Sequence, residues 1–445
     1  MSRVVAWSVL RSGHPAPLSI VDAMAAEREL DARDTALARR LVGCEVRRRG
    51  TLRAIVQHFS HRRLKPELVT HLHLGIAQLL YFDRVPDHAA VSETCGAVNE
   101  TLGQSKVPIV NGILRNLQRA LHEGHVGDPR RDVIGAALSF DQDVFRDPAE
   151  HPLLWAEDAL SMPSSLMKRW TRRHGRETAE RLALFFLEEP PLVLRVASIA
   201  PVESRDRDAI LAELQALDVP ARAGGRATSI VCPSDATAAV MQSAAFAGGR
   251  ITVQGETAAA AAELVDARDG ERVLDLCAAP GGKTAVLAGA GASVVACDVN
   301  PDRLARVADT CRRLGVSDRV RPVVSDGSAA VADESFDAAL VDAPCSNTGV
   351  LGARPAARWR YGPSTKASLA ELQRRLIAEA AERVRPGGRL VWSTCSLEPE
   401  ENGQLVRAFL ETQPNWTLAA ESLALPDPEK GPWDGGYAAR LEREG

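Results

Sequence analysis

The chain has 445 residues, of which 45% are hydrophobic and 25% charged, and it carries a formal net charge of −4. This length is too great for one ordinary core and predicts two or three domains of globular composition. The apolar run at the N-terminus is interrupted at Arg11, and no stretch approaches the roughly 18 apolar residues of a membrane span. We therefore expect a cytoplasmic protein with no membrane partner.

The eight cysteines are scattered, with no CxxC pair and no Cys/His clustering of the kind that binds zinc. They stand at positions 44, 95, 232, 277, 297, 311, 345 and 395. Free thiols in a reducing compartment fit this spacing, so we expect neither disulfides nor a metal site. We also expect a monomer.

Charge is distributed unevenly along the chain. Residues 1–125 contain 17 Lys and Arg against 12 Asp and Glu, a balance of +5, which leaves −9 for the remainder. A basic module joined to an acidic one is a hint of phosphate-backbone binding, although an ordinary solvated Arg-rich surface explains the same count equally well. On the first interpretation the expected phosphate contacts are Arg33, Arg39, Arg47, Arg48 and Arg49.

From residue 22 to about 122, apolar residues recur at intervals of three and four, and prolines at 66, 86 and 108 punctuate the pattern. This periodicity predicts a compact all-α bundle of five or six helices, which we assign to a domain of residues 1–125. Residues 126–189 are expected to contain a linker, where the periodicity is lost, and then a helical segment.

Extended and helical patterns alternate in the rest of the chain. Over residues 190–250 the alternation is short and predicts a small α+β subdomain. Over residues 251–445, apolar runs such as RVLDLCAA, SVVACDV and FDAALVDAP are separated by helical segments. That pattern is typical of a parallel sheet buried on both faces, so we expect a multidomain chain that ends in a Rossmann-like α/β domain.

The turn after the first strand of this sheet reads DLCAAPGGKT, residues 275–284. Its glycines allow close approach of a ligand to the backbone, and the helix that follows offers unpaired N–H groups to an anion. The turn is not GxGxxG, so a nicotinamide dinucleotide loses its main support and S-adenosylmethionine fits better. The turn residues expected to contact it are Cys277, Ala278, Ala279, Pro280, Gly281, Gly282 and Lys283.

Aspartates stand at the carboxyl ends of four predicted strands, at positions 275, 298, 326 and 342. In doubly wound sheets these ends surround the ligand crevice, and an acidic side chain after the second strand accepts hydrogen bonds from ribose hydroxyls. We expect Asp298 to hold the ribose and Asp326 the adenine. Any one of the four could instead be a helix N-cap, but their joint occurrence favours the ligand site.

Two cysteines also follow predicted strands, Cys345 in VDAPCSNTGV and Cys395 in VWSTCSLEPEEN. Thiols on loops of such a domain are candidate nucleophiles, and the residues alone do not decide which of the two attacks. Lys283 could lower the pKa of a thiol, contact an RNA phosphate, or simply reach solvent from the start of its helix. Cys277 and Cys297 lie in or beside predicted buried strands, so their thiols are expected to be inert.

These motifs and VQGETAAAAAELV upstream resemble, in order and spacing, the RNA cytosine-C5 methyltransferases of the Sun/Fmu class. The helical front, in RDTALARRLVGCEVRRRGTL, LGIAQLLYFDRVPDHAAVSE and VNGILRNLQR, resembles a NusB-like RNA-binding domain. The 16S ribosomal RNA cytosine-C5 methyltransferase B family joins both halves in this order, and the resemblance covers nearly the whole chain. It implies S-adenosylmethionine-dependent methylation of carbon 5 of a cytosine in 16S ribosomal RNA.

The resemblance also implies roles for single residues. In the family the cysteine of the TCS motif bonds to carbon 6 of cytosine and that of the PCS motif assists release, so Cys395 is the expected nucleophile and Cys345 the helper. Asp342 is expected to hydrogen-bond the cytosine edge or the cofactor. Family members usually have glycine where this chain has Asn347, which indicates a positive φ that asparagine also tolerates.

Three alternatives stay open. The substrate could be tRNA, because only the NusB-like front favours ribosomal RNA. An amino-group methyltransferase would share the cofactor fold, but it usually carries an Asp/Asn-Pro-Pro-aromatic loop where this chain has DAPC. A non-catalytic RNA-binding or antitermination factor would have a decayed methyltransferase domain, against which the intact glycine turn, the two thiols and the strand-end aspartates argue.

Overall fold

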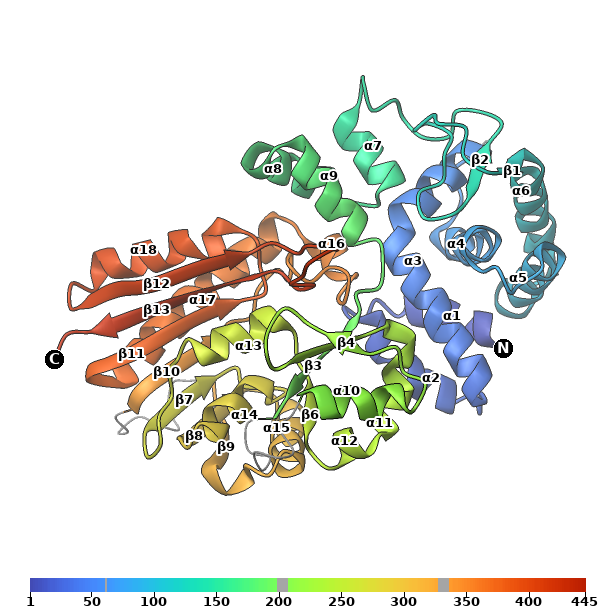
Figure 1. Cartoon of the computed structure of the whole chain (residues 1–445). Helices are drawn as coiled ribbons and strands as arrows, with labels where there is room; N and C mark the ends of the chain where they lie inside the picture. The colour runs from blue at the N-terminus through green and yellow to red at the C-terminus, as the bar shows by residue number, and fades with distance from the viewer. Residues whose placement is uncertain (61, 198–206, 327–335) are drawn as a thin grey trace. The chain divides into compact units, whose positions relative to one another are not determined.

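The computed structural model describes residues 1–60, 62–197, 207–326 and 336–445. The chain folds into two compact units, whose elements are labelled in Figure 1. One unit consists of Met1–Glu188 together with Leu351–Arg360, and the other of Glu189–Val350 together with Tyr361–Gly445. In the part of the chain that is described, no helix combines the length and the hydrophobicity needed to cross a membrane.

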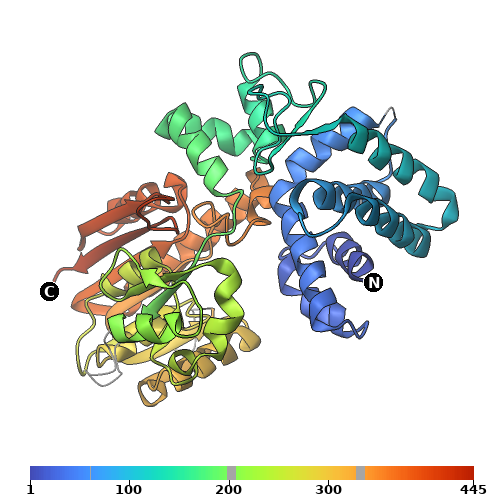
Figure 2. The ribbon, with the colours of Figure 1, turned by 45° about the vertical axis from the view of Figure 1, so that its right-hand side comes forward.

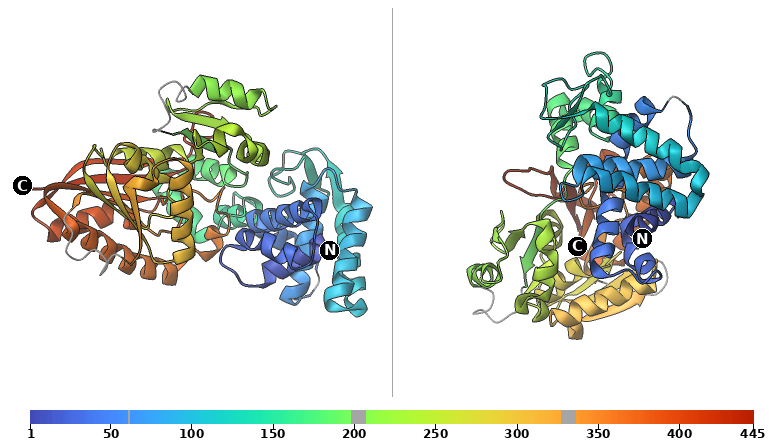
Figure 3. Two further views of the ribbon diagram at one scale, coloured as in Figure 1. Left: turned by 90° about the horizontal axis from the view of Figure 1, so that it is seen from below. Right: turned by 90° about the vertical axis from the view of Figure 1, so that its right-hand side faces the viewer.

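The first unit is built on helices coloured blue to teal in Figure 3. They are α1 (Ser2–Arg11), α2 (Val21–Ala26), α3 (Ala32–Phe59), α4 (Pro66–Tyr81), α5 (Asp87–Leu102) and α6 (Val107–Ala120). Asp31 caps α3 by accepting a hydrogen bond from the Asp34 N–H at 2.7 Å. Apolar faces of α3 to α6 share one core that includes Leu52, Leu72 and Leu114. The predicted helical bundle is thus confirmed.

Residues 126–188 are part of this unit, and Glu189 begins the other one. Strand β1 (Leu121–Glu123) pairs antiparallel with β2 (Leu138–Phe140), and helices α7 (Pro152–Ala159), α8 (Ser164–His174) and α9 (Arg176–Phe185) follow. The sequence predicts a linker at the start of this segment because helical periodicity is lost there. However, Phe140 and Phe145 are buried in the same core as Leu72, so these aromatic side chains tie the irregular backbone to the bundle.

Residues 351–360, which the sequence places in the C-terminal domain, also belong to the helical unit. The short helix α16 (Ala357–Arg360) carries Arg358, whose fully buried guanidinium donates to backbone carbonyls, among them that of Phe186 at 2.6 Å. The indole N–H of Trp359 donates to the Val46 carbonyl at 2.7 Å. Local periodicity carries no information about such contacts between distant segments.

A small α+β subdomain begins the second unit, as predicted. Its antiparallel sheet runs in the order β4-β5-β3-β6. The strands are β3 (Leu192–Val196), β4 (Arg222–Ala223), β5 (Ser229–Cys232) and β6 (Ile251–Val253), and the helices are α10 (Arg207–Gln215), α11 (Thr237–Gln242) and α12 (Ala244–Ala247). The subdomain extends past the expected boundary at residue 250 because β6 pairs with β3.

The remainder of the second unit is a mostly parallel sheet in the order β12-β13-β11-β10-β7-β8-β9, which confirms the predicted α/β domain. Strand β13 is antiparallel to both of its neighbours, β11 and the edge strand β12; β12 and β13 are dark red in Figure 2. The strands are β7 (Arg272–Leu276), β8 (Ser293–Asp298), β9 (Val320–Val324), β10 (Phe336–Asp342), β11 (Val384–Thr394), β12 (Trp416–Ala424) and β13 (Gly436–Arg443). The helices are α13 (Glu256–Glu263), α14 (Gly282–Gly289), α15 (Pro301–Arg313), α17 (Pro363–Arg383) and α18 (Gly403–Thr412).

Successive residues of the central strands alternate between two apolar layers. In β10, Ala338 and Leu340 pack in the layer that includes α14 and α15, whereas Ala339 and Val341 pack in the layer that includes α17 and α18. Burial on both faces explains why this strand is so apolar. The strand ends in the polar Asp342, at the edge of the sheet where parallel α/β folds bind their ligands.

Candidate active site

The two cysteines lie on loops that follow neighbouring parallel strands. β10 ends at Asp342 and β11 at Thr394, and Asp342 is paired in register with Ser393. The loops therefore leave the same edge of the sheet, and the sulfur atoms of Cys345 and Cys395 are 3.2 Å apart. Cys345 is 8% exposed and Cys395 is more accessible. The structure thus brings together two thiols that are fifty residues apart in the sequence.

A buried carboxylate fastens the Cys345 loop. Glu401 accepts hydrogen bonds from the N–H of Ser346 at 2.9 Å and from its hydroxyl at 2.5 Å. Thr348 Oγ1 accepts the N–H of Leu397 at 2.9 Å, which joins this loop to the segment after Cys395. The two thiol loops are thus held together by contacts that do not involve sulfur.

Sequence reasoning missed the residues that hold the two thiol loops together. Asn402 accepts a hydrogen bond from Thr394 Oγ1 at 2.6 Å and donates one to the Ser396 carbonyl at 2.8 Å, next to Glu401. The only available signal is the run of polar residues in LEPEEN directly after Cys395. Because such runs are more often solvated, their burial here could be learned only from the fold.

Asn347 lies next to both cysteines. Its φ is +60°, which confirms the left-handed conformation expected at this position. Its side-chain Nδ2 donates to the Cys345 carbonyl at 2.7 Å, and its Oδ1 accepts the Cys395 S–H at 3.3 Å. The asparagine side chain therefore contacts both cysteine loops.

Lys283 forms an ion pair with Asp342, with 2.7 Å between Nζ and Oδ2. Burial alone would lower the pKa of Lys283, but the Asp342 carboxylate, with help from Cys395 and Asp275, raises it. The ammonium is therefore charged and held inside the site. This geometry argues against the expected RNA phosphate contact for Lys283, because its side chain is only 14% exposed.

The electrostatic environment keeps a proton on Cys345. Its hydrogen bond with Cys395 and then its burial raise the pKa of the Cys345 thiol well above the usual value. Burial also raises the pKa of the Cys277 thiol to about 12. Cys297 is buried in β8, which suits the inert role expected for it.

The turn between β7 and α14 has the geometry of a ligand cradle. Gly281 has a φ of +98°, and a Cβ there would lie 3.0 Å from the Cα of Val307, so only glycine fits without a shift. A Cβ added at Gly282 would be at least 3.6 Å from every described atom. The nearest atoms belong to the Gln254 side chain. The first turn of α14 is therefore open to a ligand on this side and offers it backbone N–H groups.

Asp298 supplies a buried acceptor beside this turn. Its Oδ1 accepts the N–H of Asn300 at 3.0 Å. Its Oδ2 is buried and receives no hydrogen bond from the described residues, although the Arg303 guanidinium is 3.3 Å away as an ion pair without hydrogen-bond geometry. An unsatisfied buried carboxylate oxygen at the end of the second strand fits a ribose hydroxyl, so the residues suit a nucleoside-bearing cofactor.

The other strand-end aspartates differ in environment. Asp275 is fully buried and accepts a hydrogen bond from Thr284 Oγ1 at 2.6 Å, so it anchors the start of α14 inside the protein. Burial raises the pKa of Asp275 to about 7. Asp326 is largely exposed, with Arg375 Nη1 3.8 Å from its Oδ2. The adenine contact expected for Asp326 stays a prediction.

The arginines proposed as RNA contacts divide into two groups. Arg47 and Arg48 are buried: Arg47 donates to the Gly352 carbonyl, and Arg48 pairs with Glu188. We therefore withdraw these two as phosphate contacts, because a guanidinium enclosed by its own protein cannot reach a phosphate.

The Arg49 guanidinium is already paired inside the protein, since it donates two hydrogen bonds to the Glu45 carboxylate at 2.9 and 2.8 Å. Arg33 is exposed, and Arg39 forms an exposed ion pair with Asp22. Exposed ion pairs are weak, so Arg33 and Arg39 remain available to an RNA backbone.

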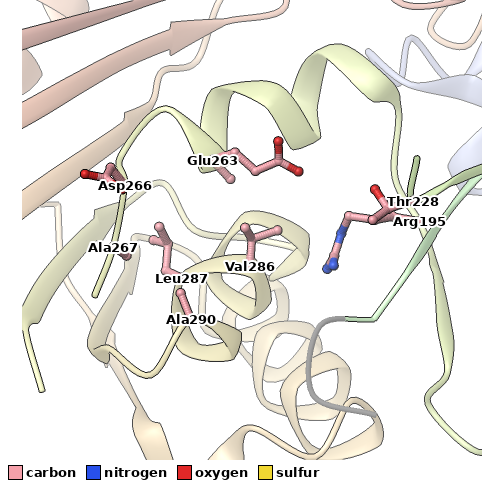
Figure 4. A pocket seen from close by; sticks show the side chains of 9 residues that line it. Arg195, Thr228, Glu263, Asp266, Ala267, Val286, Leu287 and Ala290 are labelled. Atoms are coloured by element: carbon pink, nitrogen blue, oxygen red, sulfur yellow. The ribbon is translucent and has the colours of Figure 1, made fainter. Parts of the chain in front are cut away.

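A separate cavity of about 260 Å³ lies between β3, α13 and α14 (Figure 4). Its lining includes Arg195, Glu263 and Leu287. The described residues that line this cavity include none from the cysteine loops or from the turn Cys277–Lys283.

Comparison with protein families gives two matches. A model described as 16S rRNA methyltransferase RsmB/F matches residues 262–431, and one described as NusB family matches residues 12–119. The second match agrees with the helical bundle and the first with the α/β domain.

Solved structures share the fold. PH0851 aligns with a TM-score of 0.75 and 23% identity over 99% of this chain and 98% of that chain. NSun6 from Pyrococcus horikoshii with SFG aligns with a TM-score of 0.54 and 19% identity over 63% of this chain and 98% of that chain.

Curated relatives match most of the chain. The probable ribosomal RNA small subunit methyltransferase B of Synechocystis sp. is 32% identical over 412 residues, which cover 89% of this chain and 85% of the relative. The ribosomal RNA small subunit methyltransferase B of Klebsiella pneumoniae is 34% identical over 389 residues, or 83% of this chain and 80% of the relative. The chain therefore belongs to the ribosomal RNA small subunit methyltransferase B family.

Proposed function

We propose that the chain methylates carbon 5 of a cytosine in 16S ribosomal RNA through a covalent bond between the Cys395 sulfur and carbon 6 of the base. S-adenosylmethionine-dependent methylation of ribosomal RNA is the activity of the family; the base, the atom and the covalent step are our proposal. The observation that carries it is the pair of sulfur atoms 3.2 Å apart at the ligand-binding edge of the sheet.

The chemistry requires a nucleophile from the protein. Carbon 5 of cytosine is a poor nucleophile, and addition of the Cys395 thiolate to carbon 6 forms an S–C bond and moves the electron pair of the 5,6 double bond toward carbon 5. S-adenosylmethionine, when bound, supplies the methyl group to that carbon. Loss of the C5 proton and departure of the Cys395 thiolate then restore the double bond.

The two thiols differ in protonation and in accessibility, which supports different roles for them. Cys345 keeps its proton because the hydrogen bond to Cys395 and burial raise its pKa, so it suits a proton-handling role when the product is released. Cys395 is the more accessible thiol and suits attack on a base that has left its stack. We therefore assign Cys395 as nucleophile and Cys345 as helper.

Asp342 would act on the edge of the base that carries N3 and the amino group. It is held by Lys283 at 2.7 Å, and its second oxygen is 3.5 Å from the Ser393 hydroxyl. A carboxylate in this position would hydrogen-bond a protonated N3 or the amino group of cytosine, which makes carbon 6 more electrophilic.

The cofactor would be held by groups around the glycine turn. Asp298 would bind the ribose through its unsatisfied Oδ2, the turn from Cys277 to Lys283 would lie against the methionyl part, and Asp326 would reach the adenine. The assignment of Asp298 has the strongest support, because it explains a buried acceptor that the protein leaves unsatisfied.

Small-subunit ribosomal RNA is the proposed substrate because both curated relatives are named for it. The tRNA alternative keeps the same site and differs only in the RNA. A non-catalytic factor is less well supported, because the cysteine loops keep a built network of hydrogen bonds around the thiols.

The proposal is tested by incubating the purified chain with S-adenosylmethionine carrying a labelled methyl group and with 16S ribosomal RNA or tRNA separately. Bisulfite sequencing then locates 5-methylcytosine. We expect label in 16S RNA, at a cytosine that resists bisulfite, and none with the Cys395→Ala variant. Label in tRNA alone would favour the alternative substrate, and label without a protected cytosine would overturn the C5 chemistry. Absence of cofactor binding by calorimetry would favour the non-catalytic factor.

A further inference from the structure

Asn347 contacts both thiol loops through the two ends of one amide. Nδ2 donates to the Cys345 carbonyl at 2.7 Å, and Oδ1 accepts from the Cys395 sulfur at 3.3 Å. A backbone carbonyl can only accept, so the NH₂ end must face Cys345. The carbonyl end of the amide is therefore the end that faces Cys395, and the orientation of the side chain is determined.

An amide oxygen distinguishes the two forms of a thiol. It accepts a hydrogen bond from S–H, whereas a thiolate in the same place would face the negative end of the amide dipole. Removing this oxygen should therefore make it easier to ionise Cys395. The contact also selects one orientation of the Cys395 side chain.

The backbone at this position does not need the amide. A φ of +60° is adopted most cheaply by glycine, and asparagine tolerates it through local hydrogen bonding. What asparagine adds to the loop is the side-chain contact itself. Replacing it with glycine therefore removes the contact while preserving the conformation.

We propose that Asn347 is a positioning residue that holds the Cys395 side chain as a neutral thiol and so sets the pH range in which this cysteine reacts. The inference rests on the proposed role of Cys395 as nucleophile. Among the described residues, the titratable groups on the elements around Cys395 include Cys345, Lys283, Asp342, Glu398, Glu401 and Asp434. All of them are retained when only residue 347 is changed, so a difference in titration reports that residue.

The test measures alkylation of Cys395 by iodoacetamide as a function of pH, using the full-length chain and mass spectrometry to locate the label. In Asn347→Gly the midpoint of the rate profile should fall by about half to one pH unit, the size expected for one lost hydrogen bond. In Asn347→Asp a carboxylate replaces the amide and the midpoint should rise by about one unit or more. The midpoint should therefore rise in the order Gly, Asn, Asp at position 347, and this order is the result expected from the contact.

The matched control is Asp218→Gly, which also removes a side chain from a left-handed residue, at φ +57° and on an exposed surface. It should leave the midpoint unchanged. The pH profile of kcat/KM for methyl transfer should move in parallel with alkylation. An identical midpoint in the wild type and Asn347→Gly, or a rise in the glycine variant, would overturn the inference.

If Asn347→Gly does not fold, the role of Asn347 is decided by Asn347→Asp alone. A rise in its alkylation midpoint supports the inference, and a constant or lower midpoint overturns it. Alkylation needs no RNA, so this result is separate from the proposed function. Should Cys395→Ala still methylate carbon 5, the nucleophile assignment fails even where the alkylation midpoints shift as expected. Should methylation require Cys395 while the midpoints stay fixed, only the role of Asn347 fails.

Discussion

Glu401 accepts two hydrogen bonds from Ser346, the residue directly after Cys345 in the chain. The acceptor lies beyond Cys395, in the segment after β11, so this one carboxylate joins the loops that carry the two thiols. A buried carboxylate is costly unless it is satisfied in this way. The position of Cys345 therefore depends on a residue to which the proposed reaction assigns no chemical step.

Replacing Glu401 with alanine should lower the free energy of unfolding by about 1–3 kcal/mol, because the Ser346 N–H and hydroxyl lose their acceptor inside the protein. Methyl transfer should fall by more than the loss of folded protein explains. Urea denaturation and the rate of methyl transfer measure the two effects. Glu411→Ala, at an exposed position of α18, is the control and should change stability by less than about 0.5 kcal/mol. Equal behaviour of the two variants would contradict the bridging role.

The two thiols should differ in what accumulates on the enzyme. Cys395→Ala should abolish methyl transfer and the covalent adduct, with a rate loss of several orders of magnitude. Cys345→Ala should instead trap protein on RNA, visible as a slow band on a denaturing gel. Cys95→Ala, which changes a half-buried thiol of the helical unit, should behave as the wild type. An adduct with the Cys395 variant and none with the Cys345 variant would reverse the roles.

Asp298→Ala should weaken S-adenosylmethionine binding at least about tenfold, which corresponds to roughly 1.5 kcal/mol for hydrogen bonds to a charged group. Calorimetry measures the affinity directly, without RNA. Asp302→Ala removes an exposed carboxylate from the first turn of α15 and should leave the affinity unchanged. A folded Asp298 variant that binds the cofactor normally would rule out the ribose contact.

Asp275 should make the protein less stable as the pH rises. Burial raises its pKa from 3.8 to about 7, so its contribution to stability is fully present below pH 4 and is lost as the pH rises through 7. Asparagine cannot ionise, and the free energy of unfolding of Asp275→Asn relative to wild type should therefore increase between these limits by on the order of 2–4 kcal/mol.

Urea titrations at about pH 4, 5.5, 7 and 8 measure this trend. The control is Asp309→Asn, which changes an exposed residue of α15 and should give a stability difference that is independent of pH. A constant difference for Asp275→Asn would show that the carboxyl ionises in the folded protein as it does in the unfolded chain.

Charge reversal at Arg33 and Arg39 should weaken RNA binding and reduce the slope of log affinity against log salt by about 1.5, because each phosphate contact contributes roughly 0.7–0.9. Cofactor binding should be unaffected. The matched control reverses Arg306 and Arg312, two exposed arginines of α15. If the salt slope is the same in both double variants, Arg33 and Arg39 belong to an ordinary solvated surface.

Much of the fold could be predicted because it depends on local patterns. Burial on both faces of a parallel sheet requires uninterrupted apolar strands, and the runs that contain Leu274, Ala296 and Leu340 show this directly. Helical periodicity likewise identified the bundle, and the glycine turn identified a ligand site. Each of these features is encoded by residues that are neighbours in the chain.

The sequence by itself determined the elements, the strand-end aspartates and the two candidate thiols. Tertiary structure decided that β10 and β11 are neighbours, which places Cys345 and Cys395 3.2 Å apart. Tertiary packing also buries Arg47 and Arg48. It places residues 351–360 in the helical unit. These outcomes depend on contacts between segments that are distant in the sequence. An arginine on a helix has the same local sequence pattern whether it binds a phosphate or a buried carbonyl, and only packing distinguishes the two.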